Sequence, residues 1–407
     1  MIAAAHAPAS APKIALLYAA FGPYHAVRAR AASLRQPIIA IEGSSQDSVH
    51  DWGALGETDG FQLVTLFPDG PVTARRTREV RARVFAALDE HRPDVLAVPG
   101  WAQHYALAML EWARRHRVPA IMMSDSQEID YPRTAIGEWI KRRVVRTCSA
   151  ALVAGRRHID YVEKLGLPRA HAFTGYDVVD NDHFSAGAAR VHASGALSRI
   201  GLSLPEHYFL ASARFVVTKN LGGLIHAYAS YRRQAGAQAW SLVILGDGEL
   251  RGGLEGQITQ LGLGDSVILA GYKSYDELPA YYGLAGAFVH VSTTEQWGLV
   301  VNEAMAAGLP VIVSERCGCA PELVEDGANG YIIDPFKSET LVEAMTRIAS
   351  PECDRAAMAA RSREIIAQWG PEKFANGLEQ AARIALDNPH KGGALDGGVL
   401  WLLSQLK

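Results

Sequence analysis

The sequence predicts an α/β protein of two domains, each built on a parallel sheet with helices on both faces. Three observations support this prediction: the length of 407 residues, the alternation of short apolar runs with longer helical segments, and a break in that alternation near the middle. Single hydrophobic cores stop growing at about 250–300 residues, so this length favours two domains. Apolar strands that alternate with helices are typical of parallel sheets buried on both faces.

In the first half, apolar runs predict strands over residues 14–18, 37–41, 95–98 and 120–123. Intervening segments predict helices over residues 26–34, 75–91 and 105–116. The stretch 177–205 is polar and rich in Ala, Gly and Asp, so it predicts a connection between domains. We place the N-terminal domain at residues 1–185.

The second half restarts the alternation, with strands predicted over residues 208–210, 242–245, 267–269, 287–291, 311–313 and 331–333. Helices are predicted over residues 339–349, 356–368 and 372–386. We place the second domain at residues 186–370 and expect residues 371–407 to pack back on the first domain. The last segment, GGVLWLLSQLK, is amphipathic but too short for strong interfacial binding alone, so packing is favoured over membrane contact.

The composition excludes several classes of protein. A formal net charge of -3 argues against a dedicated nucleic-acid binder. Four cysteines are too few for a disulfide framework and fit a reducing compartment. No run of 18 apolar residues is present, and the first residues lack the pattern of a signal peptide. We therefore expect a cytoplasmic protein, with peripheral contact at the inner face of the membrane left open.

Two short patterns suggest a metal ion only superficially. Cys317 and Cys319 are separated by one residue instead of the usual two, and no second pair follows at a suitable distance. Asp180 and Asp182 form an Asp-x-Asp, but they fall in the expected connection between domains. We expect no metal and no cofactor other than a co-substrate.

The informative segment runs from His290 to Ser314, HVSTTEQWGLVVNEAMAAGLPVIVS. It predicts a strand, a polar loop that holds Glu295, and a helix that begins near Gly298 and contains Glu303. The free N–H groups of Gly298, Leu299 and Val300 would point into the cleft between the domains. Such a helix start suits an anionic diphosphate, and Gly298 has no side chain to obstruct the approach.

The spacing from Glu295 to Glu303, followed by AMAAG and PVIVS, resembles the signature of the retaining GT4 family of glycosyltransferases. Arg214 and Lys219 resemble that family's basic pair, Gly246 lies in a similar strand-end turn, and Tyr272 lies in a similar base-contacting loop. The resemblance is strong over residues 208–345 and extends to the first half only in organisation. It implies a GT-B fold, in which two Rossmann-like domains face each other across a cleft.

The resemblance also implies roles for these residues. Arg214 and Lys219 would neutralise the leaving nucleoside diphosphate. Glu303 would accept hydrogen bonds from the ribose, and Glu295 would bind the donor sugar and stabilise positive charge near its anomeric carbon. Taken singly, Glu303 could be a carboxylate that interacts with the helix dipole, and Glu295 a solvated loop residue.

In the first domain, Gly22 occupies the place of the family's glycine-rich first loop, near the donor phosphates. His104, Trp101 and Asp125 follow strands and are our candidates for the acceptor side. His104 is offset from the family's usual histidine, so a helix-start residue with local hydrogen bonds is an equal interpretation. Trp101 would either stack on a sugar or fill the core.

The predicted function is the retaining transfer of a hexose from a nucleotide-diphosphate sugar to a glycan, a lipid-linked sugar or a small hydroxylated acceptor. A UDP-sugar is favoured over a GDP-sugar as the co-substrate. Two alternatives remain open: a nucleotide-sugar 2-epimerase, which shares the two-domain arrangement, and a non-catalytic partner subunit that binds a sugar nucleotide. The donor sugar, the acceptor and the linkage are not determined by these motifs.

Overall fold

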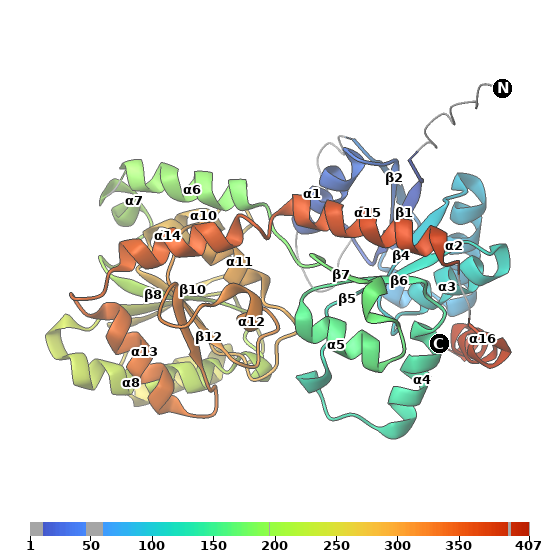
Figure 1. Ribbon diagram of the computed structural model, residues 1–407. Helices are drawn as coiled ribbons and strands as arrows, with labels where there is room; N and C mark the ends of the chain where they lie inside the picture. Colours follow the sequence, from blue (N-terminus) through green and yellow to red (C-terminus); the bar gives the residue numbers. More distant parts are fainter. Residues whose placement is uncertain (1–10, 46–59, 195, 390–391, 407) are drawn as a thin grey trace.

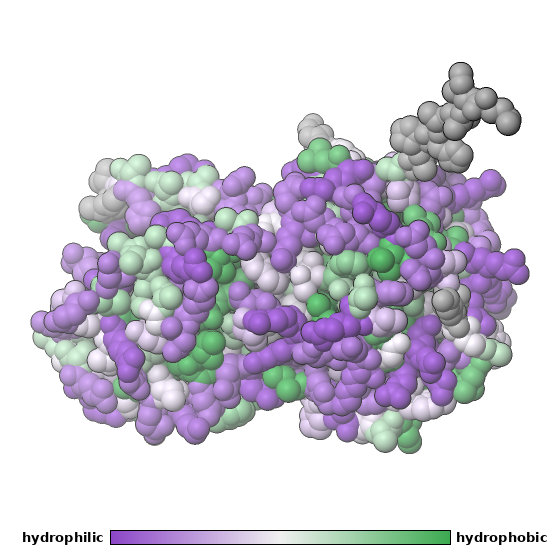
Figure 2. Space-filling view, in the orientation of Figure 1, coloured by the Kyte–Doolittle hydropathy of each residue, from purple (hydrophilic) through white to green (hydrophobic). Residues whose placement is uncertain are grey.

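The computed structural model describes residues 11–45, 60–194, 196–389 and 392–406. They form two α/β lobes that lie side by side (Figure 1). The space-filling view shows a waist between the lobes and mostly hydrophilic side chains over the visible face of both (Figure 2).

The first lobe contains a parallel sheet whose described strands have the order β3-β2-β1-β4-β5-β6-β7. The register pairs Ile14 of β1 with Ile38 on one side and with Val95 on the other. The strands are β1 (Ile14–Tyr18), β2 (Ile38–Glu42), β3 (Gln62–Thr65), β4 (Val95–Pro99), β5 (Ala120–Ser124), β6 (Ala150–Val153) and β7 (Ala172–Thr174). The helices of this lobe are α1 (Pro23–Ser33), α2 (Thr77–His91), α3 (His104–His116), α4 (Ala135–Val145), α5 (Arg156–Lys164), α15 (Pro371–Asp387) and α16 (Ala394–Leu406).

Alternate side chains of β1 enter two different cores, because successive residues of a strand point to opposite faces. Ala15 and Leu17 pack with residues of α2 and α3, whereas Ile14 and Leu16 pack with residues of α1 and α15. All four side chains are fully buried. The sheet is therefore covered on both faces, as its apolar strands predict.

The second lobe contains a parallel sheet whose described strands have the order β10-β9-β8-β11-β12-β13. Its two faces are covered in the same way by two further buried cores. The strands are β8 (Tyr208–Ser212), β9 (Ser241–Leu245), β10 (Val267–Gly271), β11 (Ala287–His290), β12 (Val311–Ser314) and β13 (Gly330–Ile333). The helices are α6 (Asn181–Ser194), α7 (Ala196–Gly201), α8 (Leu221–Ala235), α9 (Arg251–Gln260), α10 (Leu278–Leu284), α11 (Leu299–Ala306), α12 (Ala320–Leu323), α13 (Ser338–Ala349) and α14 (Arg355–Ile366). The predicted fold class, two α/β domains on parallel sheets, is confirmed.

The chain passes between the lobes twice. It leaves the first sheet after β7, and the segment between α14 and α15 returns it to the first lobe, along which α15 lies in Figure 1. The stretch 177–205 does connect the lobes, but most of it is helical instead of irregular, because its alanines favour helix. Phe184 and Ala188 of α6 are buried with Tyr282 of α10, so the expected boundary at residue 185 falls inside a helix that packs on the second lobe.

The last two helices belong to the first lobe. Phe374 and Leu378 of α15 are fully buried with Ile14 and Leu16 of β1. Leu400 of α16 is buried in the core that contains α2 and α3. Across the described ranges, none of the helices combines the length and the apolar character needed to cross a membrane.

Candidate functional site

The candidate site lies where the strand order of the second sheet reverses, between β8 and β11. Open parallel sheets bind ligands at such a switch point, beyond the carboxyl ends of their strands. Arg214 follows β8 and Glu295 follows β11, so the topology places these two residues on the two sides of the reversal. Lys219 ends the short helix η4 (Val217–Lys219), which also follows β8.

Helix α11 begins at Leu299, directly after Gly298, as the sequence predicts. Gly298 has a φ of 101°, in the left-handed region that favours glycine. The first amides of a helix have no acceptor within the helix. The N–H groups of Leu299 and Val300 are therefore available to an anion at this end of α11.

A cavity of about 600 Å³ lies at this helix start. Six of the predicted site residues line it: Arg214, Gly246, Tyr272, Leu299, Val300 and Glu303. The side chain of Arg214 is exposed, so its guanidinium can reach a ligand. The first lobe contributes Tyr24, so the cavity has walls from both lobes. Its volume is within the usual range for small-molecule sites.

Glu303 lies deep in this cavity, with 1% of its surface exposed. Tyr24 of the first lobe donates a hydrogen bond to its Oε1 (2.6 Å), and Tyr282 of α10 donates one to its Oε2 (2.7 Å). Burial raises the pKa of Glu303 to about 7, although the two tyrosine hydroxyls lower it. Glu303 is the fifth residue of α11, and no acidic residue lies in the first turn, so the helix-dipole interpretation of this carboxylate is not supported.

Glu295 lies against a lysine and a histidine instead. Its Oε2 accepts hydrogen bonds from Lys219 Nζ, from His290 Nε2 (2.8 Å) and from Ser292 Oγ (3.2 Å). Burial raises the pKa of Glu295, but the hydrogen bond and charge of His290 and the ammonium group of Lys219 outweigh burial and lower the pKa to about 2. These hydrogen bonds fix the carboxylate of Glu295, so it is not a solvated loop residue.

The candidates in the first lobe lie in different surroundings. Gly22 is the N-cap of α1 and is not among the residues that line the 600 Å³ cavity, whereas Tyr24 is. Trp101 packs edge-on against Tyr161, with ring centroids 6.1 Å apart, at the margin of the buried core. His104 is the first residue of α3.

Asp125, the remaining acceptor-side candidate, follows β5 and lies at the contact between the lobes. Its Oδ1 accepts a hydrogen bond from Gln296 Nε2 (3.1 Å), in the loop that carries Glu295. Burial and the nearby charge of Asp177 raise the pKa of Asp125 to about 7.

Three residues of the site were missed by the sequence analysis as individual candidates: Tyr24, Tyr282 and His290. Tyr24 lies two residues after Gly22, but the family's glycine-rich first loop identifies only the glycine as a candidate. Tyr282 lies in α10, just before the informative segment, but no spacing rule links it to Glu303. His290 could have been found, because a histidine that ends a buried strand at the cleft is an unusual polar residue.

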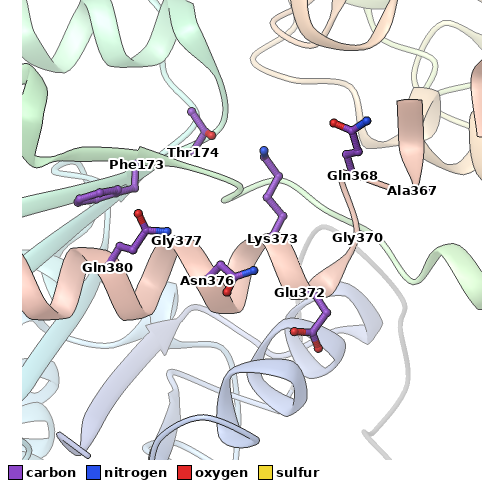
Figure 3. A pocket seen from close by; sticks show the side chains of 10 residues that line it. All are labelled: Phe173, Thr174, Ala367, Gln368, Gly370, Glu372, Lys373, Asn376, Gly377 and Gln380. Carbon is purple, nitrogen blue, oxygen red and sulfur yellow. The ribbon is translucent and has the colours of Figure 1, made fainter. Parts of the chain in front are cut away.

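A second cavity, of about 520 Å³, lies beside the segment that returns from the second lobe to the first. Figure 3 shows the side chains of Lys373 and Gln380 extending from one side of α15, whereas Glu372 points to the opposite side. There Glu372 pairs with Arg35 (3.0 Å). None of the predicted site residues lines this cavity.

The two patterns that superficially suggest a metal have structural roles. Asp180 Oδ1 accepts a hydrogen bond from the backbone of His183 in α6 (3.0 Å), and Cys317 and Cys319 are buried in the core of the second lobe. Within the ranges that the structure describes, no group of three or more His, Cys, Asp or Glu side chains is arranged to hold a metal ion.

Residues 198–365 match the family model described as glycosyl transferases group 1. Alpha-D-kanosaminyltransferase of Streptomyces kanamyceticus is 26% identical over 283 residues, which cover 67% of this chain and 69% of that protein. The GDP-mannose-dependent alpha-(1-6)-phosphatidylinositol monomannoside mannosyltransferase of Mycobacterium tuberculosis is 33% identical over 165 residues, which cover 39% of this chain and 42% of that protein. The crystal structure of Anabaena Alr3699/HepE in complex with UDP has the same fold, with a TM-score of 0.68 at 19% identity over 90% of this chain and 98% of that one.

Proposed function

We propose that the protein is a retaining hexosyltransferase, because residues 198–365 match the glycosyl transferases group 1 model and the two lobes share the fold of a UDP-bound protein. It moves a hexose from a nucleotide-diphosphate sugar to a hydroxyl group of an acceptor. The acceptor is a glycan, a lipid-linked sugar or a small hydroxylated molecule.

One observation carries the proposal: the 600 Å³ cavity combines an exposed guanidinium, a helix start and a buried carboxylate. The diphosphate binds to the N–H groups of Leu299 and Val300 and to Arg214, since both favour negative charge. The ribose donates hydrogen bonds to Glu303. Each oxygen of this carboxylate accepts one tyrosine hydroxyl, and a carboxylate has about four acceptor positions in total, so room remains for the ribose.

Glu295 and Lys219 act beside this cavity. As the bond between the anomeric carbon and the diphosphate breaks, positive charge develops on the sugar and negative charge on the leaving phosphate. The ionised carboxylate of Glu295 stabilises the first charge, and the ammonium group of Lys219 stabilises the second. The acceptor oxygen bonds to the anomeric carbon on the face that the phosphate leaves, and the hydroxyl proton passes to the phosphate, so retention needs no separate protein base.

A UDP-sugar is the preferred donor in this proposal. The support is the fold of the UDP-bound Anabaena protein, whereas the mycobacterial relative is named for GDP-mannose. Tyr272 lines the cavity, and its exposed ring can stack on either base.

Two measurements test the proposal in sequence. Nucleoside diphosphates and their sugars are first compared by thermal shift, since a ligand at about 100 times its Kd stabilises the folded state by about 2.7 kcal/mol. We expect UDP to give the largest shift. The preferred donor is then incubated with hydroxylated acceptors, and NMR determines the anomeric configuration of the product. An inverted product would refute retention, an epimerised donor would identify an epimerase, and binding without turnover would identify a partner subunit.

A further inference from the structure

The loop that carries Glu295 belongs to the second lobe, but side chains of the first lobe hold its main chain. Gln127 Nε2 donates hydrogen bonds to the carbonyl oxygen of Glu295 (2.8 Å) and to that of Arg316 (3.3 Å). His158 Nε2 contacts the carbonyl oxygen of Gln296 at 2.9 Å. Two consecutive carbonyl groups of this loop are therefore bound from across the boundary between the lobes.

The hydrogen-bond partners of His158 define its tautomer. The backbone N–H of Gly155 donates to Nδ1 (3.1 Å), so Nε2 carries the proton and donates to Gln296. His158 has 0% of its surface exposed, and this burial lowers its pKa to about 4. The imidazole is therefore a neutral, fixed donor above that pH.

The Glu295 loop is tightly packed between Gly318 and His158. Gly318 lies against the same loop, and its N–H donates to the carbonyl oxygen of Glu295 (3.1 Å). A Cβ atom added at Gly318 would lie 1.8 Å from the oxygen of Gln296 and 2.9 Å from Cε1 of His158. Only glycine permits this close approach, so a displacement of His158 would be transmitted to the loop.

Glu295 is consequently held by two lobes at once. Its carboxylate contacts Lys219 and His290 of the second lobe, and its carbonyl oxygen contacts Gln127 of the first. The side chain of Gln296 extends the contact in the other direction, to Asp125 Oδ1 (3.1 Å) and Ser126 Oγ (3.3 Å) of the first lobe.

We propose that Gln127 and His158 are positioning residues for Glu295. They fix the main chain of the Glu295 loop from the first lobe, so the carboxylate reaches its working position only while the lobes are in contact at this place. This inference rests on the proposed function, in which the carboxylate of Glu295 contacts the donor sugar and its position therefore affects the reaction. Neither residue contacts the reacting atoms.

The test distinguishes residues that position the Glu295 loop from residues that only stabilise the contact between the lobes. Gln127→Leu removes the two donated hydrogen bonds, and His158→Leu removes the imidazole donor. His158→Gln restores an N–H group near the position of Nε2. Arg156→Ala is the matched control, because the ion pair of Arg156 with Glu322 (3.0 Å) crosses the same boundary but is made to α12 and not to the Glu295 loop.

We expect kcat for sugar transfer to fall about 10- to 100-fold in Gln127→Leu and His158→Leu, since displacing a reacting group by about 1 Å can have effects of this size. The Kd for UDP should change less than about twofold, because UDP binds at Arg214 and the start of α11. His158→Gln should recover most of the lost kcat, and Arg156→Ala should retain the kcat of the unmodified protein.

Three results would overturn the proposal: an unchanged kcat in both leucine variants, an equal loss in Arg156→Ala, or no recovery in a folded His158→Gln. Absence of transfer by the unmodified protein would refute the proposed function instead. In that case crystal structures of the unmodified protein and of Gln127→Leu still test whether Gln127 positions the carboxylate of Glu295. A Glu295 carboxylate that keeps its contacts with Lys219 and His290 in Gln127→Leu would contradict it.

Discussion

Glu295 and Glu303 are eight residues apart in one segment, yet their surroundings shift their pKa values in opposite directions. Lys219 and His290 hold Glu295 ionised, with a pKa of about 2. The carboxylate of Glu303 accepts hydrogen bonds from the neutral hydroxyl groups of Tyr24 and Tyr282, and burial raises its pKa to about 7. Each unit of pKa corresponds to about 1.4 kcal/mol, so the difference in surroundings is large.

The contrast indicates a division of work between the two carboxylates. A permanently ionised Glu295 suits the stabilisation of positive charge during reaction. A Glu303 that titrates near neutrality suits a group whose charge depends on what is bound to it. The following predictions test this division, beginning with the largest expected effect.

Replacing Glu295 by Gln removes the negative charge but keeps the shape of the side chain. We expect kcat to fall about 100- to 1,000-fold, the usual loss when one preorganised electrostatic contact is removed. The Kd for UDP should change little, because UDP lacks the sugar that Glu295 would contact. Steady-state kinetics and UDP titration measure the two quantities. A loss of UDP affinity with unchanged kcat would show that Glu295 serves binding and not reaction.

Replacing Arg214 by Ala removes the exposed guanidinium from the cavity. We expect the affinity for UDP to fall about 10- to 100-fold, since a hydrogen bond to a charged group contributes about 1.5–3 kcal/mol. Isothermal titration calorimetry at low and high salt measures this change. Arg347→Ala is a suitable control, because Arg347 pairs with Glu343 of α13 and neither residue lines the cavity. Equal affinities in Arg214→Ala and the unmodified protein would exclude Arg214 from diphosphate binding.

The pKa of Glu303 predicts how UDP binding depends on pH. Ribose hydroxyls donate hydrogen bonds to the carboxylate form, so binding lowers the pKa of Glu303 and releases a proton. Affinity should therefore rise with pH, by up to about tenfold per unit below a pH of about 7, and level off above it. Calorimetry in buffers of different ionisation enthalpy measures the released proton.

Glu303→Gln provides the control for this pH dependence, because it removes the titrating group but leaves the ionisation of UDP itself. The slope should be shallower in the variant. Parallel slopes in the two proteins would mean that Glu303 does not change its protonation on binding.

The two tyrosines that contact Glu303 should differ in their effect on stability. Tyr282 is fully buried, so Tyr282→Phe leaves Oε2 of Glu303 without its donor and should lower the free energy of unfolding by about 1–3 kcal/mol at pH 8. Tyr24 is only partly buried, and water can replace its hydroxyl, so Tyr24→Phe should lower it by about 0.5–1.5 kcal/mol. Chemical denaturation gives both values, and a larger loss in Tyr24→Phe would reverse this ranking.

Much of the fold follows from sequence patterns, because apolar strands such as β1, β4 and β9 alternate clearly with helices. The start of α11 was also predictable, since Gly298 precedes a helical pattern and Gly308 and Pro310 follow it. The stretch 177–205 was harder, because its polar and small residues resemble a loop although its alanines favour helix. Helix α6 is recognised only through the burial of Phe184 and Ala188 against α10.

The candidate site was predictable only where its residues lie in one segment or follow a family pattern. Glu295, Glu303 and the start of α11 lie within a few residues of one another, so spacing reveals them. Tyr24 and Tyr282 reach Glu303 through tertiary folding, at sequence separations of 279 and 21 residues. The contacts of Gln127 and His158 with the Glu295 loop likewise depend on how the two lobes meet, which no local pattern records.

The return of α15 to the first lobe has a consequence for synthesis. The apolar face of α15 covers Ile14 and Leu16, but about 200 residues are made between β7 and α15, which takes about 10–40 s at usual elongation rates. During that interval one face of the first sheet lacks part of its cover, while the whole second lobe can emerge from the ribosome and fold. The first lobe is therefore the later of the two to be completed.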